Sequence, residues 1–237
     1  MKTGWGKLQK AIKTGKTMKR DIKYTDEKMN IAVRHPVYRA VKRFLDIVLS
    51  SLLIVILFPF FIVFSVIIFL TDFHKPLYVQ TRIGKGGRKF NLIKFRTMKY
   101  DAHDLEKYLT EDQLKLYNLE YKIEDDPRVT GIGRFLRRFS IDELPQFLNV
   151  FIGHMSLIGP RPLVEDETYL FGEDRDALLS VRPGITGLWQ VSGRNALTYE
   201  SGDRQRCEMN YIRNFGFPMD LRIFFKTFKE IFSGSGK

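Results

Sequence analysis

IVLSSLLIVILFPFFIVFSVIIFL, residues 47–70, is an uncharged apolar run in which only Ser50, Ser51 and Ser65 carry polar side chains. As a straight helix, with a rise of ~1.5 Å per residue, the run would reach about 36 Å. This length is enough to cross the ~30 Å hydrocarbon core of a bilayer. The run therefore predicts a membrane element, and the polar sequence after it must fold beside that element.

Two arrangements of this membrane element fit its length: a helix that spans the bilayer, and a re-entrant helix that enters and leaves through one face. Pro59, at the midpoint, lacks a backbone N–H and so favours a bend there. Everything after Leu70 has the polar composition of a cytoplasmic domain. Both flanks are basic, so the positive-inside rule gives no orientation and allows both ends on one side. These features favour the re-entrant helix. The flanking cations are Arg39, Lys42 and Arg43 before the run, and Lys75, Arg82, Lys85, Arg88 and Lys89 after it.

The composition of the chain bounds its class. Its 237 residues are 44% hydrophobic and carry a net charge of +12, so most of the chain should fold and should meet anionic partners. The single cysteine, Cys207, excludes an internal disulfide and a multi-cysteine metal site. We expect three parts: a basic arm over 1–40, a re-entrant membrane helix over 41–72 broken at Pro59, and a cytoplasmic catalytic domain over 73–237. The arm lies on an anionic membrane surface or is a solvated tail.

The pattern after residue 72 predicts a small α/β domain of the α+β type. Strands are expected at Leu77–Arg82 and Phe90–Phe95, joined by a glycine-rich turn at Ile83–Arg88. The glycines and cations of this turn suit phosphate contacts, although a tight turn alone would also explain them. Further elements are expected as an acidic helical surface insertion at 101–126, strands at Met155–Ile158 and Leu188–Val191, and a helix at Asp203–Arg213.

The last helix has two sides of different chemistry, and Asp220 is expected to cap its start. Phenylalanine on one side and cations on the other are typical of a helix in the membrane interface, and a core helix of the domain is the alternative. The apolar side holds Leu221, Phe224, Phe225, Phe228, Ile231 and Phe232, and the opposite side holds Arg222, Lys226 and Lys229.

The acidic pair Asp142-Glu143 stands in the stretch Ser140–Gln146, with several arginines just before it. Ser140 and Glu143 match a capping box. In that register, however, Pro145 would fall one turn into the helix and cost a hydrogen bond. With Asp142 as the N-cap, Pro145 falls among the free N–H positions and costs little. We therefore expect the helix to begin at Asp142 and to stop at Gly153.

At the positive end of a helix both carboxylates should be favoured in their ionised forms. An ionised aspartate, here Asp142, can attack phosphorus and form an acyl phosphate. Glu143 can hold Mg²⁺, a hard cation that bridges to phosphate oxygens. Arginines then neutralise the diphosphate oxygens, and Arg161 is held in a stiff loop between two prolines. The structural alternative is that the acids merely complement the helix dipole.

Several motifs, in this order, resemble those of the bacterial monotopic phosphoglycosyl transferases. The resemblance runs from about Lys42 to Phe232 and covers the catalytic core only, without the extra spanning helices of long family members. The motifs are Lys42-Arg43-x-x-Asp46, Gln80-x-Arg82-x-Gly84, Lys94-Phe95-Arg96-Thr97-Met98, Asp142-Glu143-Leu144-Pro145-Gln146, Met155-Ser156-Leu157-Ile158-Gly159-Pro160-Arg161-Pro162, and Arg182-Pro183-Gly184-Ile185-Thr186-Gly187 with Gly193-Arg194-Asn195.

The resemblance implies that a sugar 1-phosphate passes from a UDP-sugar to undecaprenyl phosphate, with release of UMP, through a covalent phosphosugar-enzyme. It makes Asp142 the nucleophile, Glu143 its metal-binding partner with Mg²⁺ as cofactor, and Pro59 the break of a re-entrant helix. Relatives often carry an aspartate shortly before Tyr-x-x-Asn, where this chain has Glu208, so Glu208 is a candidate third metal carboxylate. The residues expected around the nucleotide and phosphates are Lys94, Arg96, Arg128, Arg137, Arg161, Arg182, Gln190 and Arg194.

Two functional classes compete at this level. An enzyme of this family would sit on the cytoplasmic face of the inner or plasma membrane, with anionic lipid beside it and no nucleic acid partner. A membrane-tethered scaffold would instead use its cations to bind anionic lipid or nucleic acid, without dependence on Asp142 or Mg²⁺. The cations lie in glycine- and proline-framed loops rather than along one helical face, which favours the enzyme. The transferred sugar and the oligomeric state, including a homo-oligomer, are left open.

Overall fold

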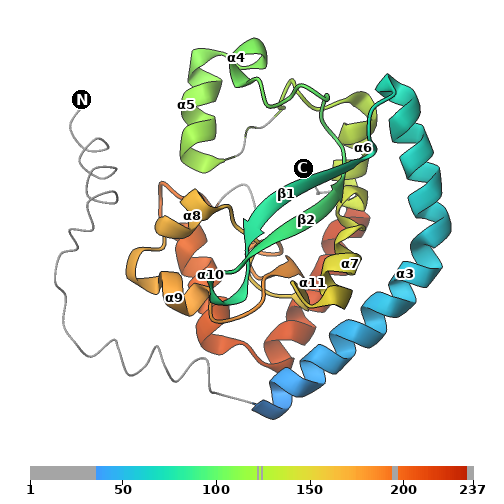
Figure 1. Ribbon diagram of the computed structural model, residues 1–237. Coiled ribbons are helices and arrows are strands. Elements are labelled where there is room, and N and C mark those ends of the chain that lie inside the picture. Colours follow the sequence, from blue (N-terminus) through green and yellow to red (C-terminus); the bar gives the residue numbers. More distant parts are fainter. Residues whose placement is uncertain (1–35, 122, 124, 194–196, 234–237) are drawn as a thin grey trace, which may run out of the picture.

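The computed structural model describes residues 36–233, apart from residues 122, 124 and 194–196. Within this part a long helix, α3, lies along one side of a domain that mixes helices with small sheets (Figure 1). This confirms the expected α+β class. The predicted basic arm lies outside the described residues, except for residues 36–40 at the start of α3.

Helix α3 (Pro36–Asp72) continues through Pro59 without interruption. It is long and apolar enough to cross a membrane, and only 6% of its most apolar window is buried within the domain. Figure 1 shows α3 curved around the domain rather than folded back on itself. The break expected at Pro59 is therefore absent from the described helix, and a reversal of direction there stays a prediction.

Both ends of α3 contact the same domain. Near its start, Lys42 forms an ion pair with Asp220 of α11 (Phe217–Ser233), and the Tyr38 hydroxyl donates to the same carboxylate at 2.6 Å. Near its end, Ile68 is 2% exposed and belongs to an apolar cluster with Phe95. Asp220 lies inside α11 and so does not cap it, because the helix begins four residues before the expected Leu221.

The predicted hairpin is confirmed. Strands β1 (Leu77–Ile83) and β2 (Lys89–Phe95) pair antiparallel, with Leu77 opposite Phe95. Between them, Gly86 and Gly87 adopt φ values of 70° and 75°. This left-handed backbone is one that glycine adopts at little cost, which explains the glycine-rich turn.

A second sheet holds two short parallel strands, β3 (Ser156–Ile158) and β4 (Gly184–Thr186). The expected strand at Met155–Ile158 is thus confirmed, whereas the one expected at Leu188–Val191 is wrong, because that segment is a turn. The reason is a close backbone approach: a Cβ on Gly184 would lie 2.1 Å from the Gly159 nitrogen. Only a residue without a side chain fits there. Strand β3 therefore pairs with Gly184–Thr186 rather than with the apolar segment Leu188–Val191.

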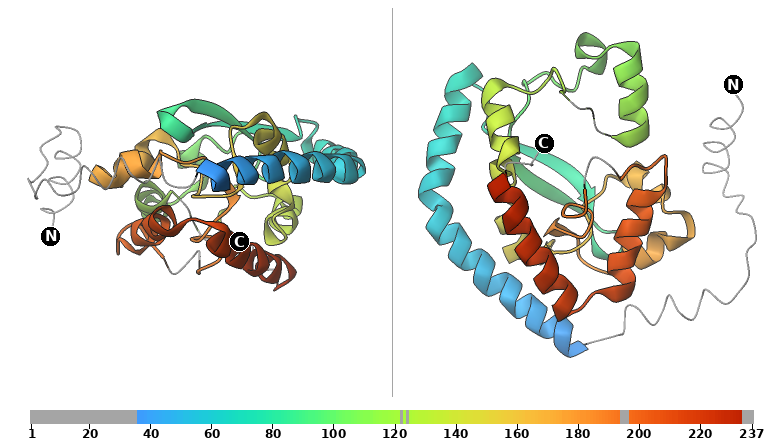
Figure 2. Two further views of the ribbon diagram at one scale, coloured as in Figure 1. Left: turned by 90° about the horizontal axis from the view of Figure 1, so that it is seen from below. Right: turned by 180° about the vertical axis from the view of Figure 1, so that it is seen from behind.

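The remaining helices surround these two sheets. In the view from below in Figure 2, the β1–β2 hairpin lies on one side of α3, and α10 and α11 lie on the other. Residues 101–126 hold two separate helices, which confirms a helical insertion. The helices are α4 (Leu105–Tyr108), α5 (Glu111–Glu120), α6 (Gly131–Arg138), α7 (Gln146–Ile152), α8 (Glu165–Tyr169), α9 (Arg175–Leu178) and α10 (Asp203–Asn214).

Helix α11 packs against the core of the domain, and its place in a membrane interface stays a prediction. Ile223 is fully buried and belongs to the largest apolar cluster of the domain. The phenylalanine side is nevertheless open, since Phe225 is 64% exposed. The exposed apolar residues of this side are Leu221, Phe224, Phe225, Phe228 and Ile231.

Candidate active site

The acidic pair lies in a short 3-10 turn, Ile141–Glu143, that precedes helix α7. Neither predicted start of the helix is correct, because α7 begins at Gln146 with Pro145 at its N-cap. Pro145 has no N–H to donate, so the N-cap is a position where it costs nothing. Ser140, at φ 55°, makes no side-chain cap, and the predicted stop at Gly153 is confirmed.

Asp142 is buried, with 8% of its surface exposed. Burial, followed by the charge of the neighbouring Glu143, raises the pKa of Asp142 to about 6, although Lys94 and Arg137 act in the opposite direction. The expectation that a helix end would favour the ionised form is therefore wrong for Asp142. Desolvation outweighs the dipole of so short a helix.

Lys94, near the end of β2, is the cation that the hairpin brings to the pair. Its Nζ lies 3.6 Å from a carboxylate oxygen of Glu143. Burial lowers the pKa of Lys94, while the charges of Glu143 and Asp142 partly offset this effect. The β1–β2 hairpin and the turn before α7 thus place a half-buried cation against Glu143, next to Asp142.

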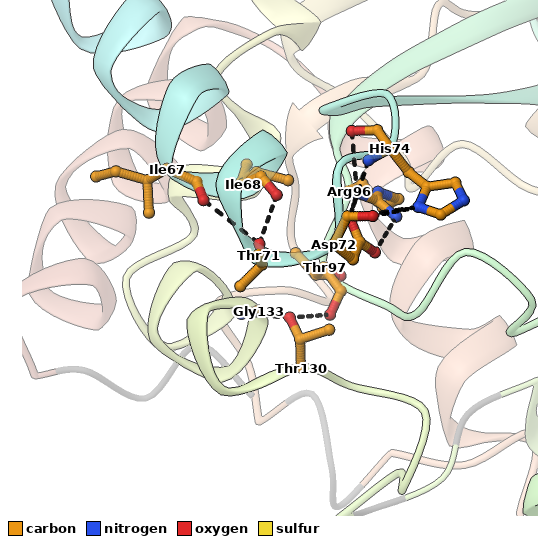
Figure 3. Close-up of polar contacts among 9 residues, drawn as sticks. All are labelled: Ile67, Ile68, Thr71, Asp72, His74, Arg96, Thr97, Thr130 and Gly133. Atoms are coloured by element: carbon orange, nitrogen blue, oxygen red, sulfur yellow. Dashed lines mark hydrogen bonds and ion pairs between the residues drawn. The ribbon is translucent and has the colours of Figure 1, made fainter.

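The residues after Lys94 fix this hairpin to its neighbours. The Arg96 guanidinium donates to Asp72 at the end of α3 at 2.6 Å, as Figure 3 shows. The Thr97 hydroxyl accepts from Arg137 Nε at 3.0 Å, and the Thr97 carbonyl accepts from the Thr130 hydroxyl at 3.3 Å. The segment 94–97 therefore connects the acidic pair, α3 and α6.

A small cleft opens beside the pair. It includes four of the predicted residues, Lys94, Glu143, Arg161 and Gln190, and two polar residues to which the sequence had given no role, Arg82 and Gln146. Both were visible within the motifs that carried the resemblance. The full lining is Arg82, Leu92, Lys94, Glu143, Gln146, Arg161, Pro162, Ile185 and Gln190.

Arg161 is held in the cleft by the loop that carries it. Its backbone N–H donates to Glu208 at 3.2 Å, and its guanidinium lies 5.2 Å from the centre of the Trp189 ring. The backbone of this loop at Gly159 also packs directly against the backbone at Gly187, since a Cβ on Gly187 would lie 2.1 Å from the Gly159 carbonyl oxygen. Such close packing holds the guanidinium at low entropic cost.

Arg82 is oriented by a buried ion network behind the cleft. Glu167, which is 2% exposed, accepts from Arg82 at 3.1 Å, from Arg204 at 3.3 Å and from the Tyr199 hydroxyl at 3.2 Å. Arg204 in turn lies 4.0 Å from the centre of the Tyr199 ring. One carboxylate thus balances two arginines, and the cleft keeps a net positive lining.

Glu208 lies with this network rather than with the acidic pair. It is 1% exposed, and burial raises its pKa to about 7. Among the described residues, no group of three or more His, Cys, Asp or Glu side chains is arranged to hold a metal ion. The structure therefore does not bring Glu208 together with Asp142 and Glu143 as a third ligand.

Four other predicted substrate residues, Arg96, Arg128, Arg137 and Arg182, do not line this cleft. Arg96 is committed to Asp72, and Arg128 forms a buried ion pair with Asp126 at 2.6 Å. Arg182 lines a different cleft. Arg137 contacts Thr97 and acts on the pKa of Asp142, and Arg194 lies outside the described residues.

The fold and the site together define an α+β domain that carries a long apolar helix and a cation-lined cleft beside an acidic pair. The sequence profile of the family described as bacterial sugar transferase matches residues 37–234. The chain belongs to this family, and the resemblance drawn from its motifs is confirmed.

Three relatives illustrate the match. The chain is 38% identical over 203 residues to the exopolysaccharide production protein ExoY of Rhizobium meliloti. This match covers 84% of this chain and 88% of that protein. It is 40% identical over 203 residues to an uncharacterized sugar transferase of Haemophilus influenzae. It is also 38% identical over 201 residues to the undecaprenyl-phosphate galactose phosphotransferase of Salmonella typhimurium. The last two matches each cover 84% of this chain but 42% of the relative, so the chain spans less than half of those proteins.

Proposed function

We propose that this protein transfers a sugar 1-phosphate from a UDP-sugar to undecaprenyl phosphate, or another polyprenyl phosphate, and releases UMP. The observation that carries this proposal is the buried Asp142 next to Glu143, which lines a cleft together with Lys94, Arg82 and Arg161. A buried carboxylate among cations suits attack on an anionic diphosphate. Relatives named for galactose phosphate transfer to undecaprenyl phosphate and for exopolysaccharide production support the same reaction.

In the first step, a carboxylate oxygen of Asp142 attacks the sugar-bearing phosphorus of the donor. The bond from this phosphorus to the bridging oxygen breaks, and that oxygen leaves on UMP. In the second step, a phosphate oxygen of the polyprenyl phosphate attacks the same phosphorus, and the Asp142 carboxylate is restored. Arg82, Arg161 and Lys94 neutralise the phosphate oxygens in both steps.

The donor set suits Mg²⁺, which takes one or two protein carboxylates and completes its shell with phosphate oxygens and water. Glu143 lines the cleft and its side chain is 25% exposed, so it is the residue that would hold the ion. When bound, Mg²⁺ would supply charge neutralisation for the diphosphate.

The protein is proposed to work as a monotopic enzyme on the cytoplasmic face of the inner or plasma membrane. Both ends of α3 contact one polar domain. If α3 crossed the bilayer, its two ends would lie on opposite faces and could not both keep these contacts. The exposed apolar sides of α3 and α11 then lie in the bilayer. Pro59 is where a deeper bend of α3 would cost least, because a hydrogen bond is already missing there.

Release of UMP tests the proposal. The full chain in detergent, with a UDP-sugar, Mg²⁺ and polyprenyl phosphate, should release UMP and form a lipid-linked sugar. With donor alone, it should release at most one UMP per protein, because the phosphosugar stays on Asp142. Asp142→Asn should lose both signals, whereas Asp112→Asn, on exposed α5, should keep them. A fully active Asp142→Asn variant would overturn the proposal and favour the scaffold. A screen of UDP-glucose, UDP-galactose and N-acetylated donors would identify the sugar.

A further inference from the structure

A second cleft lies where the first turns of α3, the tip of the β1–β2 hairpin and the segment before β4 meet. It shares no lining residue with the catalytic cleft. Two sequence features that were expected at the substrate phosphates, the hairpin tip and Arg182, meet here instead. Its charged lining residues are the five cations Arg39, Lys42, Arg43, Lys85 and Arg182, and the single acid Asp46.

Part of this charge is used to fasten α3. Lys42 pairs with Asp220, and Arg43 donates to the carbonyl oxygens of Val150 and Phe151 at 2.7 and 2.8 Å. Asp46 accepts from the Leu157 N–H at 2.9 Å and from the Ser156 hydroxyl at 3.1 Å. The one acid of the cleft is therefore committed to β3, and it is not among the charges that act on Lys85.

Two other cations of the cleft act on Lys85. Burial lowers the pKa of Lys85, and the nearby charges of Arg39 and Arg182 lower it further. Arg182 donates through Nε to the Gly153 carbonyl at 2.8 Å, and its two terminal nitrogens contact no acceptor within the part of the chain that the structure describes. An anion between Lys85 and Arg182 would neutralise this charge and supply the acceptors.

The rim of the cleft is apolar. Tyr38 lines the cleft, and the ring of Phe217, which is 48% exposed, packs 5.0 Å from it. On α3, Val37 is 74% exposed and Phe44 is 65% exposed, each one residue from a lining residue of the cleft. A soluble anion would leave this rim in water, whereas a lipid would cover it with acyl chains.

We propose that this cleft binds the phosphate group of an anionic membrane phospholipid. The lipid would bridge α3, the hairpin tip and the segment before β4, and so would hold the domain at the bilayer surface. The proposal does not rest on the catalytic function, because it uses none of the residues of the catalytic cleft.

Lipid titration followed by native mass spectrometry tests this proposal with the full chain in neutral detergent. Phosphatidylglycerol should bind saturably, and phosphatidylcholine should bind more weakly. Lys85→Ser should weaken phosphatidylglycerol binding about tenfold, the effect of losing a charge-assisted hydrogen bond, and Lys85→Arg should retain it. The matched control is Arg88→Ser, which removes the same charge from the same hairpin at an exposed position outside the cleft and should leave binding unchanged.

Three results would overturn the proposal. Equal losses in Lys85→Ser and Arg88→Ser would show diffuse surface attraction, and equal binding of the two lipids would show no preference for an anion. Displacement of phosphatidylglycerol by millimolar inorganic phosphate would assign the cleft to a soluble anion.

Discussion

Asp142 is a carboxylate held where an ionised group is costly. Its pKa is raised from 3.8 to about 6, so the folded protein binds this proton more tightly than the unfolded chain does. The stability that this group contributes is therefore fully present below about pH 4 and is lost as the pH rises to about 6. Above that pH the parent protein buries a charge that an asparagine would not carry.

Asp142→Asn should consequently stabilise the fold at neutral pH while it removes activity. One pKa unit corresponds to ~1.4 kcal/mol, so a rise of about two units predicts a gain on the order of 3 kcal/mol at pH 7.5 and little at pH 4. Chemical unfolding with EDTA present, at both pH values, measures this difference. Asp112→Asn, at a surface position, should change stability at neither pH, and no gain at pH 7.5 for Asp142→Asn would contradict the burial argument.

Glu208 and Glu143 should respond differently to Mg²⁺. Glu208 accepts the backbone N–H of Arg161 and lies in the buried network, so Glu208→Gln should leave the Mg²⁺ concentration for half-maximal UMP release unchanged. Glu143→Gln removes the proposed ligand and should raise that concentration at least about tenfold. An equal shift in both variants would restore Glu208 as a metal ligand.

The sequence predicted four residues of the catalytic cleft because they stand in motifs with a chemical rationale. The motifs do not distinguish arginines that line the cleft from arginines that form ion pairs within the fold. Asp126, two residues before Arg128, was a visible sign of the local ion pair that takes up that guanidinium. Asp72, the partner of Arg96, lies 24 residues away, and no local pattern indicates that contact.

At the scale of the element, α6 packs against the Thr97 carbonyl through a glycine. A Cβ on Gly133 would lie 1.9 Å from that oxygen, so Gly133→Ala should destabilise the protein by about 2 kcal/mol or more. Gly131→Ala, in the same helix, meets nothing within 4 Å and should leave stability unchanged or slightly higher. Thermal unfolding of the two variants gives the comparison, and equal effects would mean that α6 shifts freely.

The end of α3 is fastened by the pair Asp72–Arg96, whose side chains are 28% and 11% exposed. A double-mutant cycle with Asp72→Asn and Arg96→Gln should give a coupling free energy of about 1 kcal/mol, because the pair is two-pronged and partly shielded. The surface pair Asp112–Lys115, which is 94% and 70% exposed, should give a coupling near zero. Equal coupling in the two cycles would show that the contact does not hold α3.

The hairpin, α7, α10 and β3 were predictable because turn glycines and apolar periodicity act locally. The start of α7 and the place of β4 were not. Pro145 is tolerated wherever the helix needs no hydrogen bond from its backbone nitrogen. A 3-10 turn before the helix meets this condition as well as an earlier helix start does. The pairing of β4 depends on the approach of Gly184 to Gly159, a contact between segments that no periodicity records.

At the scale of the whole molecule, α3 is the element that decides how the protein meets a membrane. Its apolar run is nearly unburied, yet Lys42 near its start and Asp72 at its end are both tied to the polar domain. A spanning arrangement would have to break one of these two contacts. A helix that dips into one leaflet keeps both and still covers its apolar surface with lipid.

Cysteine labelling of membrane vesicles distinguishes the two arrangements. In a Cys207→Ser background, Pro36→Cys and Lys75→Cys place single thiols at exposed positions at the start of α3 and just after its end. An impermeant maleimide should label both in inside-out vesicles and neither in right-side-out vesicles, with Asp112→Cys as the control for the face that holds the domain. Labelling of Pro36→Cys and Lys75→Cys from opposite faces would reject the monotopic arrangement, because the contacts at the two ends of α3 could not then exist together.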